Sequence, residues 1–254
     1  FLFVLFYGNE DAVVDIFPSR SVAQRQEIKE QYKTTFGRVL MEWMLITDPD
    51  FIFQGGGTDE KCLVEILSSR SNQEIKNICE AYTQEYGSSL EDDVASETAG
   101  HFHRVLVSLL TALYDAGEAC WGTDETCFLR ILCVRSHAHL RNVFKRYNEI
   151  AGNDIIASIK SEMSGNLEDV LLAMVKCIID LPGYFAERLY KSMKGMGTDD
   201  KTLARIMVAR AEIDMLDVRK AFKAKYEESL HSFIEDDTSG SFARLLLRLC
   251  GGDD

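Results

Sequence analysis

The sequence lacks the marks of several common protein classes. Its 254 residues include only 3 prolines, and no stretch approaches the roughly 18 consecutive apolar residues of a membrane span. The apolar opening, residues 1–7, has no basic start and no small-residue cleavage site, so it fits a core or truncated helix better than a signal peptide. The 7 cysteines form no C-x-x-C pair. They predict buried thiols of a reducing cytosol rather than a disulfide framework or zinc site.

Positive charge is also scarce. The net charge is -13 and the isoelectric point is near 4.9, and no basic stripe with interleaved aromatics occurs. These features argue against nucleic acid as a partner. A protein this acidic is repelled by acidic lipid surfaces unless a cation bridges the two.

Signals of strands and of enzymes are missing as well. There is no sustained alternation of β-branched residues and no Asn-Gly or Asp-Gly hairpin turn. The glycine-rich segment 55–61 fails the phosphate-loop pattern, and no EF-hand loop is found. The pairs His101/His103 and His137/His139 could ligate a metal, but they do not occupy equivalent repeat positions, which favours partly exposed helix residues. No serine or cysteine has a recognisable base motif nearby, so we expect no enzyme.

An internal repeat is the main feature that is present. A Gly-Thr-Asp segment starts at Gly57, Gly122 and Gly197. An arginine lies 12 residues after each threonine: Arg70, Arg135 and Arg210. Apolar residues recur between them with i, i+3, i+4 spacing, which predicts one buried helical stripe: Leu63, Ile66, Leu67; Phe128, Ile131, Leu132; Leu203, Ile206, Met207. A fainter fourth copy comes first: Val13, Ile16, Phe17 and Arg20.

Each copy continues with a second amphipathic helix, a short polar segment and a final helix. The apolar pairs of the second helix are Ile28 and Tyr32, Ile75 and Tyr82, Leu140 and Tyr147, and Leu216 and Phe222. The last helix of the chain carries Phe242, Leu245, Leu246 and Leu249. The predicted fold class is therefore all-α.

The loop before each repeated helix carries glycines. In the segment 193–198 one helix is expected to end and the next to begin, and glycine at positive φ lets several carbonyls turn outward together. Thr198 suits the N-cap of the next helix, with Asp199 and Asp200 in its first turn. We therefore interpret these two aspartates as structural rather than as metal ligands.

A better ligand carboxylate lies farther along. The residue 39 positions after each loop threonine is acidic every time: Glu97, Glu162 and Asp237. Convergent carbonyls plus one bidentate carboxylate give about five hard oxygen ligands, and Ca²⁺ takes 6–8. Water or a lipid phosphate can complete the shell. One carboxylate per ion leaves positive charge for an anionic headgroup.

With these motifs the chain resembles the annexins from Asp11 onward. The most specific matches are the loop 193–200, the Asp237-Thr238-Ser239-Gly240 turn and the tail 249–254; the segment 116–123 resembles the third-repeat loop of the family. The resemblance implies four repeats of up to five helices in a curved disc, with Ca²⁺ sites on the convex side. It also implies a cytoplasmic protein that joins acidic, phosphatidylserine-type membranes peripherally when calcium rises. Protein partners would use an N-terminal tail.

Carried over residue by residue, the resemblance implies three ligand sets. The carbonyls, each set followed by its carboxylate, are Phe53, Gly55, Gly57 with Glu97; Gly117, Cys120, Gly122 with Glu162; and Met193, Gly195, Gly197 with Asp237. Trp121 would lie at a loop tip and contact the headgroup region. A buried core tryptophan is the alternative.

The first half departs from this pattern. We expect repeat I at 1–50, repeat II at 51–113, repeat III at 114–181 and repeat IV at 182–254. Repeat I reads Tyr7-Gly8-Asn9-Glu10 and has Thr47 at the acid position, so no calcium site is expected there. Gly37 and Thr58 are 21 residues apart where repeat IV has 46, so the last helix of repeat I and the first helix of repeat II are predicted to be missing.

Two functions remain open at this point. The first is calcium-dependent binding to acidic phospholipid membranes in membrane organisation, trafficking or repair. The second is a helical scaffold that acts mainly through protein partners. Three ligand sets with spaced carboxylates favour the first, because a scaffold has no need of them.

Overall fold

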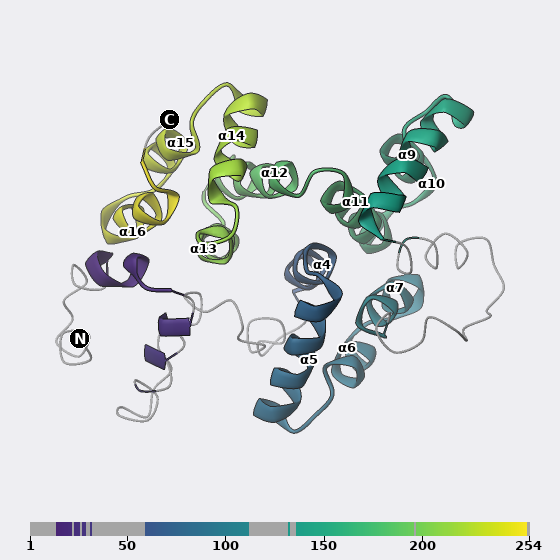
Figure 1. Cartoon of the computed structure of the whole chain (residues 1–254), viewed down its shortest axis with the longest axis horizontal. Helices are drawn as coiled ribbons and strands as arrows, with labels where there is room; N and C mark the ends of the chain where they lie inside the picture. Colours follow the sequence, from purple (N-terminus) through teal and green to yellow (C-terminus); the bar gives the residue numbers. More distant parts are fainter. Residues whose placement is uncertain are drawn as a thin grey trace. The chain divides into compact units, whose positions relative to one another are not determined.

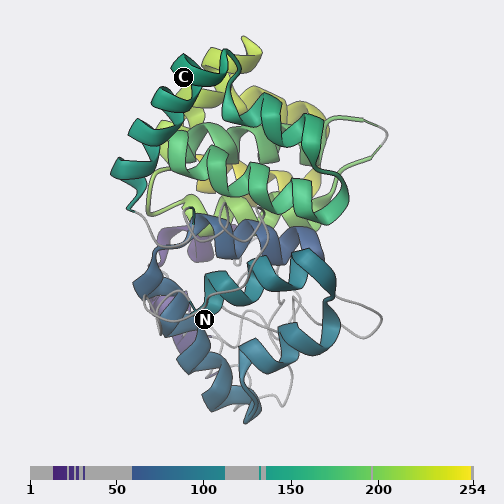
Figure 2. The same ribbon diagram turned by 90° about the vertical axis from the view of Figure 1, so that its right-hand side faces the viewer.

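The computed structural model describes residues 14–21, 23–25, 27–28, 31, 59–111, 132, 136–195 and 197–252. Within these residues every regular element is helical, as Figures 1 and 2 show from two directions. The all-α prediction is confirmed. The chain divides into two compact units, one of residues 1–48 and 182–254 and the other of residues 49–181.

The unit of residues 49–181 contains parts of repeats II and III. Its helices are α4 (Glu60–Ser69), α5 (Asn72–Tyr86), α6 (Leu90–Glu97), α7 (Gly100–Thr111), α9 (His137–Ala151), α10 (Ile155–Glu162) and α11 (Gly165–Ile179). Helix α11 packs most extensively against α4, and it also contacts α7, α9 and α10. The two repeats are thus joined through α4 and α11.

The other unit contains a complete five-helix repeat. Its elements are η1 (Phe17–Ser19), α12 (Leu181–Met193), α13 (Asp200–Arg210), α14 (Met215–Tyr226), α15 (Leu230–Asp237) and α16 (Gly240–Cys250). Helix α16 packs on α13, α15 and η1. Five helices in repeat IV match the upper number expected for one repeat.

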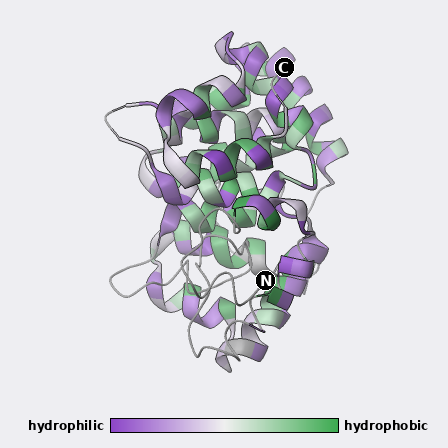
Figure 3. Cartoon of the chain, turned by 90° about the vertical axis from the view of Figure 1, so that its left-hand side faces the viewer, coloured by the Kyte–Doolittle hydropathy of each residue, from purple (hydrophilic) through white to green (hydrophobic). Residues whose placement is uncertain are grey.

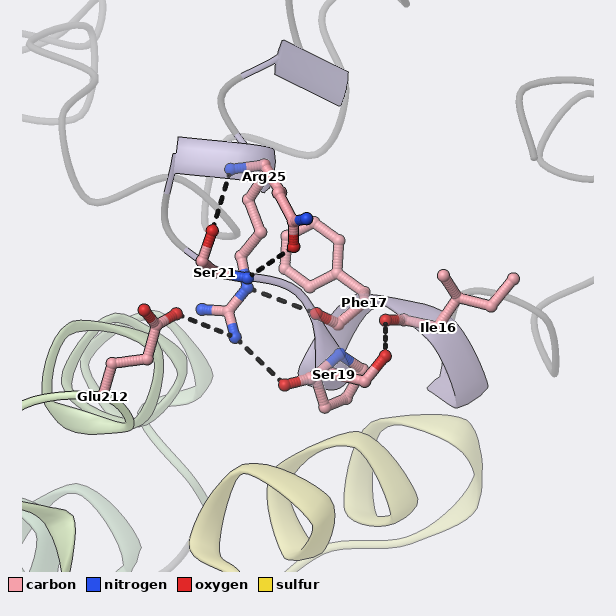
Figure 4. Close-up of polar contacts among 8 residues, drawn as sticks. Ile16, Phe17, Ser19, Ser21, Arg25 and Glu212 are labelled. Carbon is pink, nitrogen blue, oxygen red and sulfur yellow. Dashed lines mark hydrogen bonds and ion pairs between the residues drawn. The ribbon is translucent and has the colours of Figure 1, made fainter.

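Within this unit, Arg25 joins the start of the chain to repeat IV. Its Nε donates to the carbonyl of Phe17 at 3.2 Å and its Nη2 to that of Pro18 at 3.3 Å. The Glu212 carboxylate lies 3.7 Å from Nη2 (Figure 4). Burial lowers the pKa of Arg25, and Glu212 opposes this shift. The guanidinium also lies over the ring of Phe17, 5.2 Å from its centroid.

Capping residues explain why the helices start and stop at equivalent places. The side chains of Ser71 and Ser136 cap α5 and α9. Gly87 and Gly152 end the same helices at φ 71° and 70°, a conformation that costs glycine little. In repeat IV the equivalent residue is Glu227, a non-glycine residue at φ 62°.

The core confirms most of the predicted apolar stripes and corrects one. Leu203, Ile206 and Met207 are fully buried. Leu216, which the sequence analysis placed in the stripe of the next helix, is 65% exposed, and Met215 is buried instead. Met215 is 17 residues after Thr198, as Leu140 is after Thr123, so Met215 is the equivalent position. The prediction was wrong by one residue, which turns a side chain by about 100° around a helix.

Helix α13 is buried on more than one stripe. All residues from Thr202 to Arg210 are buried, including Arg205 and Arg210. Arg210 forms an ion pair with Asp214 and lies over the ring of Phe185. Amphipathicity alone therefore understates how central this helix is. Hydropathy colours alternate along most other helices (Figure 3).

The cysteines in the described residues form no disulfide. Cys62, Cys177 and Cys250 are buried and Cys79 is half-buried, as expected for core thiols. Cys120, Cys127 and Cys133 lie outside the described residues.

In the part of the chain that the structure describes, none of the helices has the length and apolar character needed to cross a membrane.

Candidate metal centre

The loop between α12 and α13 is the one predicted ligand loop whose glycines the structure describes. Helix α12 ends at Met193 and α13 begins at Asp200, as predicted. Gly195 and Gly197 have φ 132° and 95°. A Cβ added at either glycine would meet no atom within 4 Å, so backbone conformation rather than space requires glycine here.

The helix after the loop is capped one residue later than expected. The Asp199 side chain accepts from the backbone N–H of Thr202 at 3.1 Å, which makes Asp199 the N-cap and places Asp200 at the first helical position. Thr198 is therefore not the cap, and that prediction was wrong. In repeat II, Asp59 caps α4 in the same way through Cys62. The interpretation of the loop aspartates as structural is confirmed for Asp59 and Asp199.

Thr198 instead connects the loop to the predicted carboxylate. Its hydroxyl lies 2.7 Å from Oδ2 of Asp237 and 3.3 Å from the carbonyl oxygen of the same residue. These two residues are 39 positions apart, the interval that the sequence repeats three times. The structure thus brings Asp237 to the loop of Gly195 and Gly197. The spacing signalled the carboxylate, but the linking role of the threonine was missed.

The three predicted carboxylates occupy the same place in their repeats. Glu97, Glu162 and Asp237 are each the last residue of an eight-residue helix. Glu97 and Glu162 are exposed and Asp237 is half-buried. A glycine with φ between 63° and 65° starts the following helix in each case: Gly100, Gly165 and Gly240.

Side-chain hydrogen bonds support these turns in two of the repeats. The hydroxyl of Thr98 donates to the carbonyl of Val94, and that of Thr238 to the carbonyl of Ile234, each at 2.6 Å. Both threonines directly follow the predicted ligand. They therefore fix the end of the helix that carries it.

The other predicted ligands lie outside the described residues. These are Phe53, Gly55, Gly57, Gly117, Cys120 and Gly122, together with Trp121. Over the residues that are described, no three His, Cys, Asp or Glu side chains gather as for a metal ion. A site in repeat IV would rest on Asp237 and the loop carbonyls, and this all-oxygen donor set fits Ca²⁺.

Comparison with known proteins identifies the family. The annexin family model matches residues 52–109, 111–174 and 184–249. The chain belongs to the annexin family. Annexin A4 of Mus musculus is 50% identical over 287 residues, covering 97% of this chain and 90% of the relative. Annexin A4 of Bos taurus is 49% identical with the same coverage. Membership in the annexins supports calcium-dependent phospholipid binding as the general activity and points to no enzymatic family.

Solved annexins share the fold. Chicken annexin V gives a TM-score of 0.81 at 43% identity, covering 96% of this chain and 90% of that chain. A calcium-bound annexin (Sm)1 gives 0.77 at 26% identity, covering 96% and 85%. The alignment to mouse annexin A4 is longer than the 254 residues of this chain, so some positions of that alignment have no counterpart here. Their assignment to repeats I and II, like the four repeat boundaries, stays a prediction.

Proposed function

We propose that this annexin binds acidic, phosphatidylserine-type membranes through Ca²⁺ held at three loops. The observation that carries the proposal is the hydrogen bond between Thr198 and Asp237, which joins loop and carboxylate in repeat IV. The ligands there would be the carbonyls of Met193, Gly195 and Gly197 with the Asp237 carboxylate. Ca²⁺ at this site would supply the positive charge that the protein itself lacks.

Charge favours a cation bridge over direct attraction. The chain carries 41 acidic against 28 basic residues. A surface of acidic lipids repels such a chain, and a bound Ca²⁺ with a single protein carboxylate keeps part of its charge for a lipid phosphate. This reasoning extends to repeat II, with Glu97, and to repeat III, with Glu162 and Trp121 as a headgroup contact.

The cellular role follows from this activity. A protein that joins membranes only when calcium rises would stay in the cytoplasm at rest and serve membrane organisation, trafficking or repair afterwards. Partners that recognise an N-terminal tail would add specificity.

Vesicle co-sedimentation tests the proposal. With phosphatidylserine-containing vesicles, the protein is expected to pellet in Ca²⁺ and to return to the supernatant after a chelator is added. Neutral phosphatidylcholine vesicles are the control and should leave it in solution. Binding that persists in chelator would contradict the calcium bridge and would favour a scaffold that acts through other contacts.

Substitution of the carboxylates tests the sites one by one. Asp237→Ala and Glu162→Ala should each raise the calcium concentration for half-maximal binding, because each removes the only carboxylate proposed for its ion. Asp236→Ala is the matched control for the first, since Asp236 is an exposed acid next in the chain. A midpoint that moves equally in Asp236→Ala and Asp237→Ala would show a general charge effect instead.

A further inference from the structure

An aromatic cluster lies directly behind the proposed repeat IV site. Tyr190 of α12 stacks on Tyr226 of α14, with ring centroids 3.8 Å apart. It also contacts Phe222 at 6.2 Å and Phe233 of α15 at 5.4 Å. Phe222 and Phe233 meet edge-on at 5.5 Å. The cluster therefore joins three helices of the repeat.

Tyr190 contacts both halves of the proposed site through near neighbours. On one side, the ammonium of Lys194 lies over its ring, 4.8 Å from the centroid. Lys194 stands between Met193 and Gly195, two of the proposed carbonyl ligands, and its backbone N–H donates to the Tyr190 carbonyl at 2.9 Å. On the other side, Phe233 lies one helical turn before Asp237 on α15.

This arrangement differs from the equivalent place in the other repeats. The residue pair 11 positions apart is Phe222 and Phe233 in repeat IV, where rings pack. In repeat II it is Tyr82 and Asp93, and the phenol donates to the carboxylate at 2.5 Å. In repeat III it is Tyr147 and Ser158, joined by a hydrogen bond of 3.0 Å.

The sequence agrees with a special role for residue 190. Eight residues before the loop threonine, repeats II and III carry Asp50 and Asp115, whereas repeat IV carries Tyr190. An aromatic ring from the loop-bearing helix is thus available in repeat IV where the other two repeats have an acid.

We infer that Tyr190 is a positioning residue for the repeat IV calcium site, one that fixes the distance between the loop carbonyls and the Asp237 carboxylate. This inference rests on the proposed function. Aromatic side chains pack with defined geometry and have few rotatable bonds, so a ring between two elements limits their relative movement. A site whose ligands are already in place binds with less ordering cost.

A double-mutant cycle tests the inference. The calcium midpoint for binding phosphatidylserine vesicles is measured for the wild type, Tyr190→Leu, Asp237→Ala and the double variant. Tyr190→Leu should raise the midpoint about two- to tenfold, the range expected for one aromatic pair. It should add nothing in the Asp237→Ala background, because the site it positions is already lost.

Two further variants separate positioning from general damage. Tyr190→Phe keeps the ring and should stay near the wild-type midpoint. Tyr184→Leu removes a buried tyrosine from the same helix, away from the loop, and should leave the midpoint unchanged. Urea unfolding in chelator shows that each variant is folded.

Each other outcome overturns a defined statement. If Tyr190→Leu shifts the midpoint equally in both backgrounds, or not at all, the positioning role is wrong while the proposed site stands. If Asp237→Ala alone leaves the midpoint unchanged, the repeat IV site itself is wrong, and the positioning role fails with it.

Discussion

At the scale of single residues, the Gly-Thr-Asp segment divides its work. The glycines supply the backbone conformation, Thr198 holds Asp237, and Asp199 caps α13. The sequence could predict that the aspartates were structural, because acids favour a helix N-terminus. It could not decide which of two adjacent cap-forming residues serves as the cap, since Thr and Asp are both good N-caps. That choice depends on Asp237, which is distant in sequence.

Removing the cap should cost stability with little effect on calcium. Asp199→Ala is expected to lower the free energy of unfolding by about 1 kcal/mol, because the N–H of Thr202 loses its acceptor. Asp200→Ala is the control and should cost only a few tenths of a kcal/mol, the size of a dipole interaction. Urea denaturation measures both. An Asp199→Ala midpoint for calcium as high as that of Asp237→Ala would instead make Asp199 part of the site.

Hydrogen bonding to Asp93 gives a pH-dependent contribution. The hydroxyl of Tyr82, and then that of Ser88, lowers the pKa of this carboxyl below its ordinary 3.8. A group with a lowered folded-state pKa stabilises the fold above its unfolded pKa, and this stability is lost as pH falls through the folded pKa.

Tyr82→Phe should therefore be acid-dependent in its effect. At pH 7 it should lower the free energy of unfolding by about 1 kcal/mol, the size of one hydrogen bond. The difference from wild type should shrink as pH falls below 3.8. Urea denaturation at several pH values measures it. A difference that does not change with pH would mean that the phenol acts through packing and not through the carboxylate.

At the scale of elements, equivalent positions explain both the successes and the misses. Gly87 and Gly152 end α5 and α9 in the left-handed conformation, and the sequence pattern placed those ends well. In repeat IV the glycine is absent, α14 begins at Met215, and counting apolar residues selected Leu216 instead. Periodicity tolerates a shift of one residue when several apolar residues are adjacent. Only the packing of Met215 in the core resolves it.

Glu227 should be a site of easy stabilisation. It holds φ 62° at the end of α14, where its Cβ is unfavourable. Glu227→Gly is expected to raise the free energy of unfolding by about 0.5–1 kcal/mol, because glycine adopts this conformation without that penalty. Glu228→Gly is the matched control in the next position and should not stabilise. A loss of stability in Glu227→Gly would indicate that the side chain makes a compensating contact.

At the scale of the whole molecule, Arg25 ties residues near 17 to residues near 212. The family pattern predicted four repeats, but not that a buried guanidinium would bind two backbone carbonyls there. The contact involves main-chain oxygens, which carry no side-chain signal in a sequence.

The two partners of Arg25 should differ in importance. Arg25→Ala is expected to lower the free energy of unfolding by about 2–4 kcal/mol, because it removes a buried side chain and leaves carbonyls without donors. Glu212→Ala should cost under about 1 kcal/mol, since this carboxylate is 39% exposed and 3.7 Å away. Thermal and urea unfolding measure both. Equal losses would make the ion pair, not the carbonyl contacts, the main link.

The division into two units has a consequence for synthesis on the ribosome. Residues 49–181 form one continuous unit, whereas the other unit combines residues 1–48 with residues 182–254. At about 5–20 residues per second, the segment around Phe17 emerges roughly ten to forty seconds before Glu212. The inner unit can therefore fold while the early segment still waits for its partner. During that interval the buried side of Phe17 is a natural target for chaperones.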